Sequence, residues 1–254
     1  MHIPTISVDS SGHHAELDGQ TLFRGSVEDA LDTFLGKAPA CAQLLITPNV
    51  DQVNRLITDA QWRATFRSGD FYLIDGAPVL GLLKLLGAKG FHRVTGADLL
   101  PTAAKRATKE HTIVILGGKD EVREAAIEQL RAQNPDARFE GISIPFQATP
   151  EANEDIAEQL AALAPQLVFI CLGSPKQEQW FQANQEHLPP AFYVGAGAAV
   201  DFAAGAVNRA PKLMQKLGLE WFYRLLQEPR RLAKRYLVVG PMFILVVIAS
   251  LLRK

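Results

Sequence analysis

Asp75 is the acidic residue best placed to do chemistry. It directly follows the apolar run 71–74 and precedes Gly76. A carboxylate in that position can act as a general base where its surroundings raise its pKa. It can equally cap a helix that begins near Ala77. The position alone favours neither interpretation.

Two glycines follow another apolar run, in the segment Gly195-Ala196-Gly197. Glycines let backbone N–H groups approach a pyrophosphate closely. A dinucleotide site would need a third glycine, where this chain has Val200, and an acid about 20 residues further on. The sequence has neither, so the pattern favours a phosphate-binding loop of another kind. An NAD(P)-dependent oxidoreductase stays open as an alternative.

The sequence lacks the patterns that commonly hold metal ions. It contains no Asp-x-Asp pair, which many nucleotide-sugar enzymes use to hold a divalent metal on a diphosphate, and its six histidines show no metal-ligand spacing. We therefore expect no metal and no cofactor. Backbone amides, helix N-termini or arginines would then have to balance the charge of a departing diphosphate.

Apolar runs that end in turn residues alternate with segments of helical spacing. The runs with the character of buried strands are 43–49, 71–76, 111–118, 138–144, 166–173 and 191–197. The segments with helical spacing are 51–68, 76–87, 97–109, 120–133, 151–163 and 176–186. This alternation predicts an α/β fold, with a Rossmann-like, mostly parallel sheet and helices on both faces. Ligands bind such sheets at the carboxyl ends of the strands, where Asp75 and the two glycines lie.

The two ends of the chain depart from this alternation. Residues 6–17 and 20–23 predict a small N-terminal hairpin, followed by a helix over 26–35. At the other end we expect a helical C-terminal appendage, so that the α/β domain covers 1–215 and the appendage covers 216–254.

Composition excludes some classes of protein. The chain has 26 Lys+Arg and 27 Asp+Glu, so its overall charge gives no indication of a nucleic-acid partner. The two cysteines, Cys41 and Cys171, lie in apolar runs and predict buried free thiols in a reducing compartment. The first residues show no signal-peptide pattern. We expect a cytoplasmic protein.

The appendage begins with a basic stretch and ends in the nearly uncharged run 236–252. That run is at the lower edge of the length of a membrane-spanning helix, and Gly240-Pro241 would break or kink it. It could span a membrane, lie on its surface or form an interface in a homo-oligomer. We favour a helix that lies on the inner face of the plasma membrane.

Four segments, in one order along the chain, resemble the WecG/TagA/CpsF glycosyltransferases, which form glycosyltransferase family 26. They are TPNVDQV (47–53) with Asp75-Gly76, RVTGADL (93–99), GSPKQEQW (173–180) and the long segment 195–236. The last contains the Gly-Leu-Glu-Trp and Glu-Pro-Arg-Arg elements, and the resemblance covers about residues 40–245.

The resemblance implies an inverting, metal-independent transfer of a sugar from a UDP-sugar. The leading expectation for that sugar is N-acetylmannosamine or its uronic acid, although Ala198 stands where the family pattern more often has a glycine. The acceptor would be an undecaprenyl-diphosphate-linked saccharide at a membrane surface, in the synthesis of a bacterial teichoic acid, enterobacterial common antigen, capsule or exopolysaccharide. A non-catalytic membrane scaffold that binds a UDP-sugar stays open as a second alternative.

The resemblance also assigns roles to particular residues. It implies Asp75 as the general base on the acceptor hydroxyl, and the other residues implied in catalysis are Thr47, Asn49, Arg93 and Gln177. Those implied in donor binding are Gly173, Gly195, Gly197, Asp201 and Phe146. The basic residues of the appendage either form a solvated face or grip the phosphates of the acceptor or donor; they are Arg224, Arg230, Arg231 and Arg235. We favour phosphate binding by these residues, because the resemblance implies a diphosphate ligand.

Overall fold

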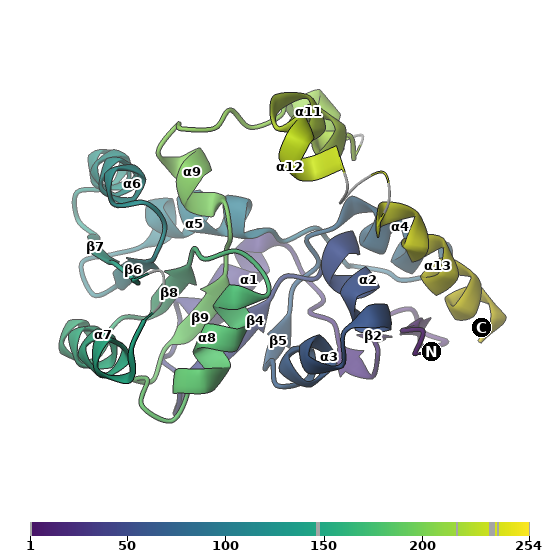
Figure 1. Ribbon diagram of the computed structural model, residues 1–254, viewed down its shortest axis with the longest axis horizontal. Helices are drawn as coiled ribbons and strands as arrows, with labels where there is room; N and C mark the ends of the chain where they lie inside the picture. The colour runs from purple at the N-terminus through teal and green to yellow at the C-terminus, as the bar shows by residue number, and fades with distance from the viewer. Residues whose placement is uncertain (1, 146–147, 217, 234–236, 238, 254) are drawn as a thin grey trace.

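The centre of the molecule is a six-stranded parallel sheet (Figure 1). The computed structural model describes residues 2–145, 148–216, 218–233, 237 and 239–253. The strand order is β5-β4-β9-β8-β6-β7, and all neighbours are parallel. The strands are β4 (Gln43–Ile46), β5 (Phe71–Tyr72), β6 (Thr112–Leu116), β7 (Arg138–Ile142), β8 (Leu167–Ile170) and β9 (Phe192–Gly195). Each predicted strand run contains one of them, which confirms the parallel α/β fold.

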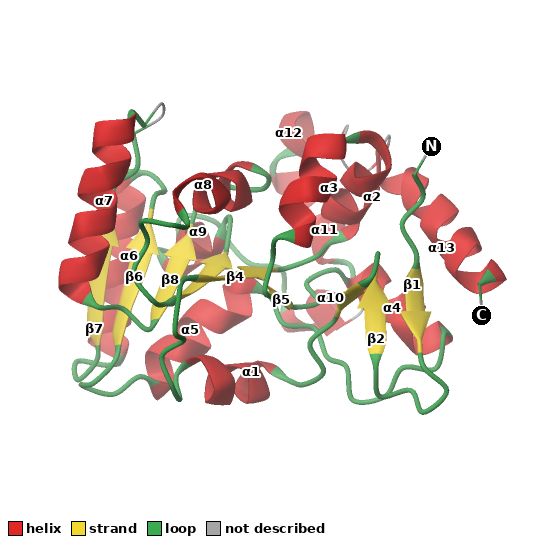
Figure 2. Cartoon of the chain, turned by 90° about the horizontal axis from the view of Figure 1, so that it is seen from below, coloured by secondary structure: helices red, strands yellow, loops and turns green. Residues whose placement is uncertain are grey.

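Helices cover both faces of this sheet, as Figure 2 shows for α7, α8 and α3 on one side and α1 and α5 on the other. The first face carries α2 (Val50–Thr58), α3 (Ala60–Arg67), α7 (Pro150–Leu163) and α8 (Lys176–Asn184). The second carries α1 (Val27–Phe34), α5 (Gly96–Arg106), α6 (Asp120–Gln133) and α9 (Ala199–Ala203). Successive side chains of a strand point to opposite faces of the sheet, so Ile113 belongs to one apolar cluster and Val114 to the other.

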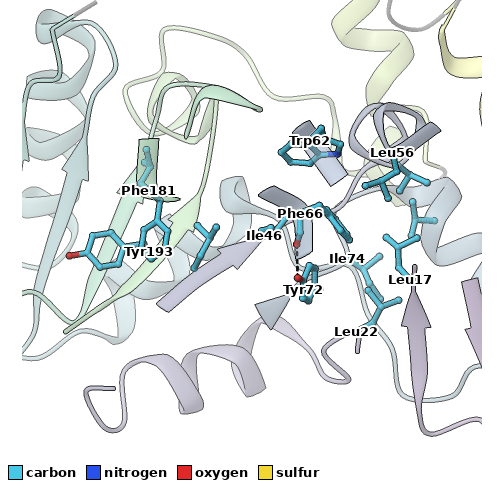
Figure 3. Close-up of a cluster of buried hydrophobic side chains, with 14 of the residues drawn as sticks. Leu17, Leu22, Ile46, Leu56, Trp62, Phe66, Tyr72, Ile74, Phe181 and Tyr193 are labelled. Carbon is cyan, nitrogen blue, oxygen red and sulfur yellow. Dashed lines mark hydrogen bonds between the residues drawn. The ribbon is translucent and has the colours of Figure 1, made fainter. Parts of the chain in front are cut away.

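The segment 51–68, predicted to be helical, forms two helices, because the chain breaks at Asp59. The Asp59 backbone leaves the helical region, and its carboxylate accepts a hydrogen bond from the Trp62 N–H at 2.9 Å, which caps α3. The break turns the Trp62 and Phe66 side chains into the core beside Tyr72 (Figure 3). The Trp62 indole N–H donates to the Gln52 carbonyl of α2 at 2.9 Å, so the two helices are fixed to each other.

The N-terminal residues form a small antiparallel sheet with three strands, in the order β1-β2-β3. These strands are β1 (Ile6–Val8), β2 (Ala15–Leu17) and β3 (Gln20–Thr21). The predicted hairpin is therefore present, but the run 6–17 forms two strands, β1 and β2, instead of one. The reason is Asp9, whose carboxylate accepts hydrogen bonds from the backbone N–H groups of His13 and His14 and so closes an additional turn.

One of the two cysteine predictions is wrong. Cys171 is buried at the end of β8, as expected, but Cys41 is an exposed free thiol. Cys41 lies in the connection that precedes β4 rather than in the strand itself, so its side chain is not enclosed by the sheet and its helices.

The C-terminal part of the chain is a series of short helices. They are α10 (Lys212–Lys216), α11 (Glu220–Gln227), α12 (Pro229–Ala233), a 3-10 helix η2 (Gly240–Met242) and α13 (Phe243–Leu252). This confirms a helical C-terminal part, while the predicted boundary after residue 215 stays a prediction. Within the described ranges, no helix combines the length and the apolar character that crossing a bilayer requires.

One face of α13 is part of the protein core. Phe243 and Val246 are 8% and 0% exposed and belong to the same apolar cluster as Ile6 and Val53. The Ile6 N–H donates to the Ser250 hydroxyl at 2.9 Å, which attaches α13 to the first strand of the N-terminal sheet. Figure 2 shows β1 beside α13. Helix α13 thus covers its own chain with one face and leaves the other exposed.

Candidate active site

A cavity of about 680 Å³ lies at the carboxyl ends of the central strands. Its walls come from the segments that follow β4, β5, β8 and β9, together with the start of α5 and parts of α9, α11 and α13. The strands are parallel, so their carboxyl ends meet at one edge of the sheet and bring residues from distant parts of the sequence to one place.

Most of the site residues predicted from the sequence line this cavity. Those that line it are Thr47, Asn49, Asp75, Arg93, Gly173, Gln177, Gly195, Gly197, Asp201 and Arg224. Arg230 is exposed on α12 and is not among the lining residues. Phe146, Arg235 and the side chain of Arg231 lie outside the described residues.

Asp75 occupies the loop after β5 and is held close to the loop after β4. The backbone N–H groups of Asp75 and Gly76 both donate to the Pro48 carbonyl, at 3.1 and 3.2 Å. Helix α4 (Ala77–Leu85) has Gly76, not Asp75, at its N-cap. The position of Asp75 in the cavity wall agrees with a chemical role, and its role as general base stays a prediction.

Asn49 has a structural contact as well as a place in the cavity wall. Its side-chain oxygen accepts hydrogen bonds from the N–H groups of Asp51 and Gln52, at 3.1 and 3.2 Å, and the Gln52 side chain accepts one from the Asn49 N–H at 3.3 Å. This reciprocal capping box fixes the start of α2. The end of the loop after β4 is therefore held by hydrogen bonds at the point where it meets the cavity.

A buried cluster of amides and one carboxyl group lies behind the cavity. The Oε1 atom of Glu178 accepts a hydrogen bond from the side-chain Nε2 atoms of Gln52 and of Gln177, at 3.1 and 2.9 Å. The Gln177 side-chain oxygen in turn accepts from the Gly197 N–H at 3.1 Å. Burial raises the pKa of Glu178, and the hydrogen bond from Gln177 opposes that rise. Sequence analysis singled out Gln177 but gave no role to Glu178 or Gln52.

An ion-pair network joins α11 to the α/β domain. Glu220 pairs with Arg93 at 2.9 Å and with Arg209 at 3.3 Å, and Arg209 also pairs with Asp98 at 2.7 Å. Burial raises the pKa of Asp98, but the hydrogen bond and charge of Arg209 outweigh it and hold that pKa below its ordinary value. Arg209 and Glu220 were not predicted as site residues, although both lie in the 195–236 segment that carries the family resemblance.

Arg224 brings a second guanidinium group to the cavity, from α11. It lies over the Phe202 ring, with its Cζ atom 5.6 Å from the ring centroid, and it lies 3.9 Å from Glu228. Its Nε atom is buried and makes no hydrogen bond to a described residue. Arg93 is paired with Glu220 and Arg224 with Glu228, and both arginines line the cavity.

The remaining charged groups of the cavity are acidic. Besides Asp75, they include Asp51, Asp201 and Glu220. In the part of the chain that the structure describes, His, Cys, Asp and Glu side chains form no group of three that could hold a metal ion. The expectation of a metal-independent site stays a prediction.

The fold and the cavity together define an α/β protein that binds its ligand at the strand ends, with an acid, amides, glycines and arginines around it. The family model described as "Glycosyl transferase WecG/TagA/CpsF family" matches residues 17–254. The chain belongs to this family and is a glycosyltransferase. This confirms the resemblance seen in the sequence motifs and disfavours the oxidoreductase alternative.

Proposed function

We propose that the protein is an inverting glycosyltransferase that moves a sugar from a UDP-sugar to a polyprenyl-diphosphate-linked saccharide at a membrane surface. N-acetylmannosamine or its uronic acid is the first donor sugar to test, in the synthesis of a bacterial surface polysaccharide. The observation that carries this proposal is that one cavity holds Asp75 from the α/β domain and Arg224 from the C-terminal helices. This reaction needs a carboxylate that acts as a base on the acceptor hydroxyl and a cation that balances the charge of the leaving diphosphate.

Asp75 is the proposed general base. In an inverting transfer, the acceptor hydroxyl attacks the anomeric carbon on the face opposite to the leaving UDP, and a base removes the hydroxyl proton. The proposal is supported by the place of Asp75 in the cavity wall, with the N-cap of α4 left to Gly76.

The backbone near Gly173 and Gly197 is proposed to hold the UDP. Both glycines have positive φ, at +76° and +52°, and a Cβ atom on either would meet nothing within 4 Å. The glycines therefore serve the backbone turn and leave open space on the cavity side. Charge that builds on the departing diphosphate would be met by backbone N–H groups and by Arg224.

The proposed membrane surface is the exposed apolar side of the C-terminal helices. Apart from Leu85, all the large apolar side chains that are exposed among the described residues lie between Leu213 and Leu252. Trp221 and Ile244 belong to this set and also line the cavity, so the apolar surface reaches the cavity. Large exposed apolar surfaces are typical of membrane or partner contacts. A lipid-linked acceptor would reach Asp75 from that side.

The experiment that tests the reaction is a product analysis. We would incubate the protein with a panel of UDP-sugars and an undecaprenyl-diphosphate-linked saccharide, weigh the lipid product, and determine its anomeric configuration by NMR. We expect one added sugar with inverted configuration. Donor binding without turnover across the panel would instead support the scaffold alternative.

The Asp75→Asn variant tests the base assignment. The amide keeps the shape of the side chain and removes its basicity, so we expect kcat to fall by at least about 100-fold while UDP still binds. The control is Asp136→Asn, which makes the same change in an exposed loop after α6. Wild-type turnover in Asp75→Asn would contradict the assignment.

A further inference from the structure

Glu178 is a buried carboxyl group at the junction of three strand-end loops. Its side chain is 0% exposed, and it does not line the cavity. Through Gln52 it contacts the first turn of α2, which follows β4, and through Gln177 the loop after β9, while Glu178 itself lies on α8, which follows β8. A carboxyl group that is fully buried among amides is costly unless its hydrogen bonds fix something that the protein needs.

The hydrogen bonds of Glu178 determine which way the Gln177 amide faces. Glu178 Oε1 accepts two N–H groups, so the NH₂ end of Gln177 points toward it. The Gln177 oxygen then faces the Gly197 N–H, which can only donate. A flipped amide would place two donors against each other at Gly197 and an oxygen against Glu178 Oε1. Oε1 can accept in either protonation state of the carboxyl group, so this orientation holds in both.

The backbone at Gly195 is shaped to admit this arrangement. A Cβ atom there would lie 2.5 Å from Gln177 Nε2 and 3.1 Å from Glu178 Oε1, so only glycine leaves room for the two side chains. The Thr47 hydroxyl donates to the Gly195 carbonyl at 3.1 Å from the other side. The backbone that leads into Gly197 is thus held by side chains from the loop after β4 and from α8.

We propose that Glu178 is a positioning residue: it orients the Gln177 amide, and the Gln177 oxygen in turn fixes the Gly197 N–H in the wall that receives the diphosphate of the donor. The second part of this inference rests on the proposed function. The first part concerns the protein without ligand and can be tested separately.

The direct readout is the side-chain NH₂ signal of Gln177 in NMR spectra of the full chain without ligand, assigned by its loss in Gln177→Ala. We expect slow hydrogen exchange of this NH₂ group in the wild type and in Glu178→Gln, whose amide oxygen can replace Oε1. We expect fast exchange in Glu178→Ala. If that variant does not fold, Glu178→Met fills a similar volume and also removes the acceptor.

The second readout is the affinity for UDP, measured by calorimetry. Loss of one positioned hydrogen bond should raise the Kd about 3- to 10-fold in Glu178→Ala and leave it near the wild-type value in Glu178→Gln. The control is Phe181→Leu on the same helix, a core change beside Tyr193 that lowers Tm without touching the cluster. We expect this control to keep both the slow exchange and the UDP affinity.

A double-mutant cycle separates positioning from general destabilisation. If Glu178 acts through Gln177, adding Glu178→Ala to Gln177→Ala should weaken UDP binding no further. Additive losses, or slow exchange of the Gln177 NH₂ group in Glu178→Ala, would overturn the proposal. Fast exchange in that variant supports the first part even if the wild type binds no UDP, an outcome that would contradict the proposed function and, with it, the second part.

Discussion

The small size of Gly195 is required by the packing of the cavity wall. Its missing side chain leaves the space that Gln177 Nε2 and Glu178 Oε1 occupy, and its carbonyl accepts the Thr47 hydroxyl. A methyl group at this position would have to move a buried amide that is only 2% exposed. The backbone and the side chains of the site are therefore packed together rather than independently placed.

We expect Gly195→Ala to lower stability by about 1–3 kcal/mol, as overpacking does in a filled core, and to weaken UDP binding because the Gln177 amide is displaced. The control is Gly81→Ala on the exposed face of α4, where a Cβ would meet nothing within 4 Å. That change should raise stability by about 0.4–1 kcal/mol and leave binding unchanged. Urea unfolding and calorimetry measure both effects; equal behaviour of the two variants would contradict the argument.

The sequence predicted individual site residues better than their partners. Thr47, Asp75 and Gln177 stand at strand ends or in family motifs, so position and type indicated them. Glu178 and Glu220 were missed as partners because their contacts cross large sequence separations. Gln52 and Glu178 are 126 residues apart, and Arg93 and Glu220 are 127 apart. A residue pattern along one chain does not show which distant residue will balance a buried charge.

At the scale of elements, α13 is attached to the protein at its start and near its end. The Asn54 side-chain amide donates to the Val239 carbonyl at 2.7 Å, just before η2. Near the other end of α13, the Ser250 hydroxyl accepts the Ile6 N–H and donates to the Val246 carbonyl. Ser250 is 2% exposed, so the Ile6 N–H has no access to water as an alternative partner.

We expect Ser250→Ala to lower the free energy of unfolding by about 1–3 kcal/mol, because it leaves the buried Ile6 N–H without an acceptor. The control is Ser10→Ala in the exposed turn after β1, which should change stability by less than about 0.5 kcal/mol. Thermal or urea unfolding measures the difference. An unchanged stability in Ser250→Ala would show that this hydrogen bond does not hold α13 in place.

The elements of the sheet were predictable from sequence, but the place of the C-terminal helices was not. Each strand of the sheet is an apolar run between turn residues, and that local pattern is sufficient to identify it. The run 236–252 is also apolar, yet its composition does not distinguish a protein core from a lipid surface. Only the contacts of Val246 and Ser250 show that one face of α13 packs on its own chain.

At the scale of the whole molecule, exposed apolar side chains gather at one end. In Figure 1, α13 lies at the right and α7 at the left, at opposite ends of the longest axis. Ile248 and Leu252 are 49% and 82% exposed on α13. Because these side chains contribute little to folding, they can be changed without loss of the fold.

We expect the double variant Ile248→Glu with Leu252→Glu to reduce binding to vesicles of anionic phospholipids by at least about tenfold, since each buried apolar side chain contributes about 1.5–3 kcal/mol. Its Tm should stay close to that of the wild type. The control adds the same charges at the other end, as Ala161→Glu with Ala162→Glu on the exposed face of α7. Vesicle sedimentation measures binding; equal binding by wild type and the α13 variant would rule out this surface as the membrane contact.

The contacts between β1 and α13 also bear on how the fold depends on the order of its segments. Besides the Ile6–Ser250 hydrogen bond, Arg253 donates to the Thr5 hydroxyl at 3.1 Å, so the first strand and the last helix are direct neighbours. A short flexible linker between them would close the polypeptide into a ring. New ends then fit in the exposed turn at Pro135 and Asp136, between α6 and β7. Because β1 and α13 are in contact, a circular permutant could join them by this linker and carry its new ends far from α13.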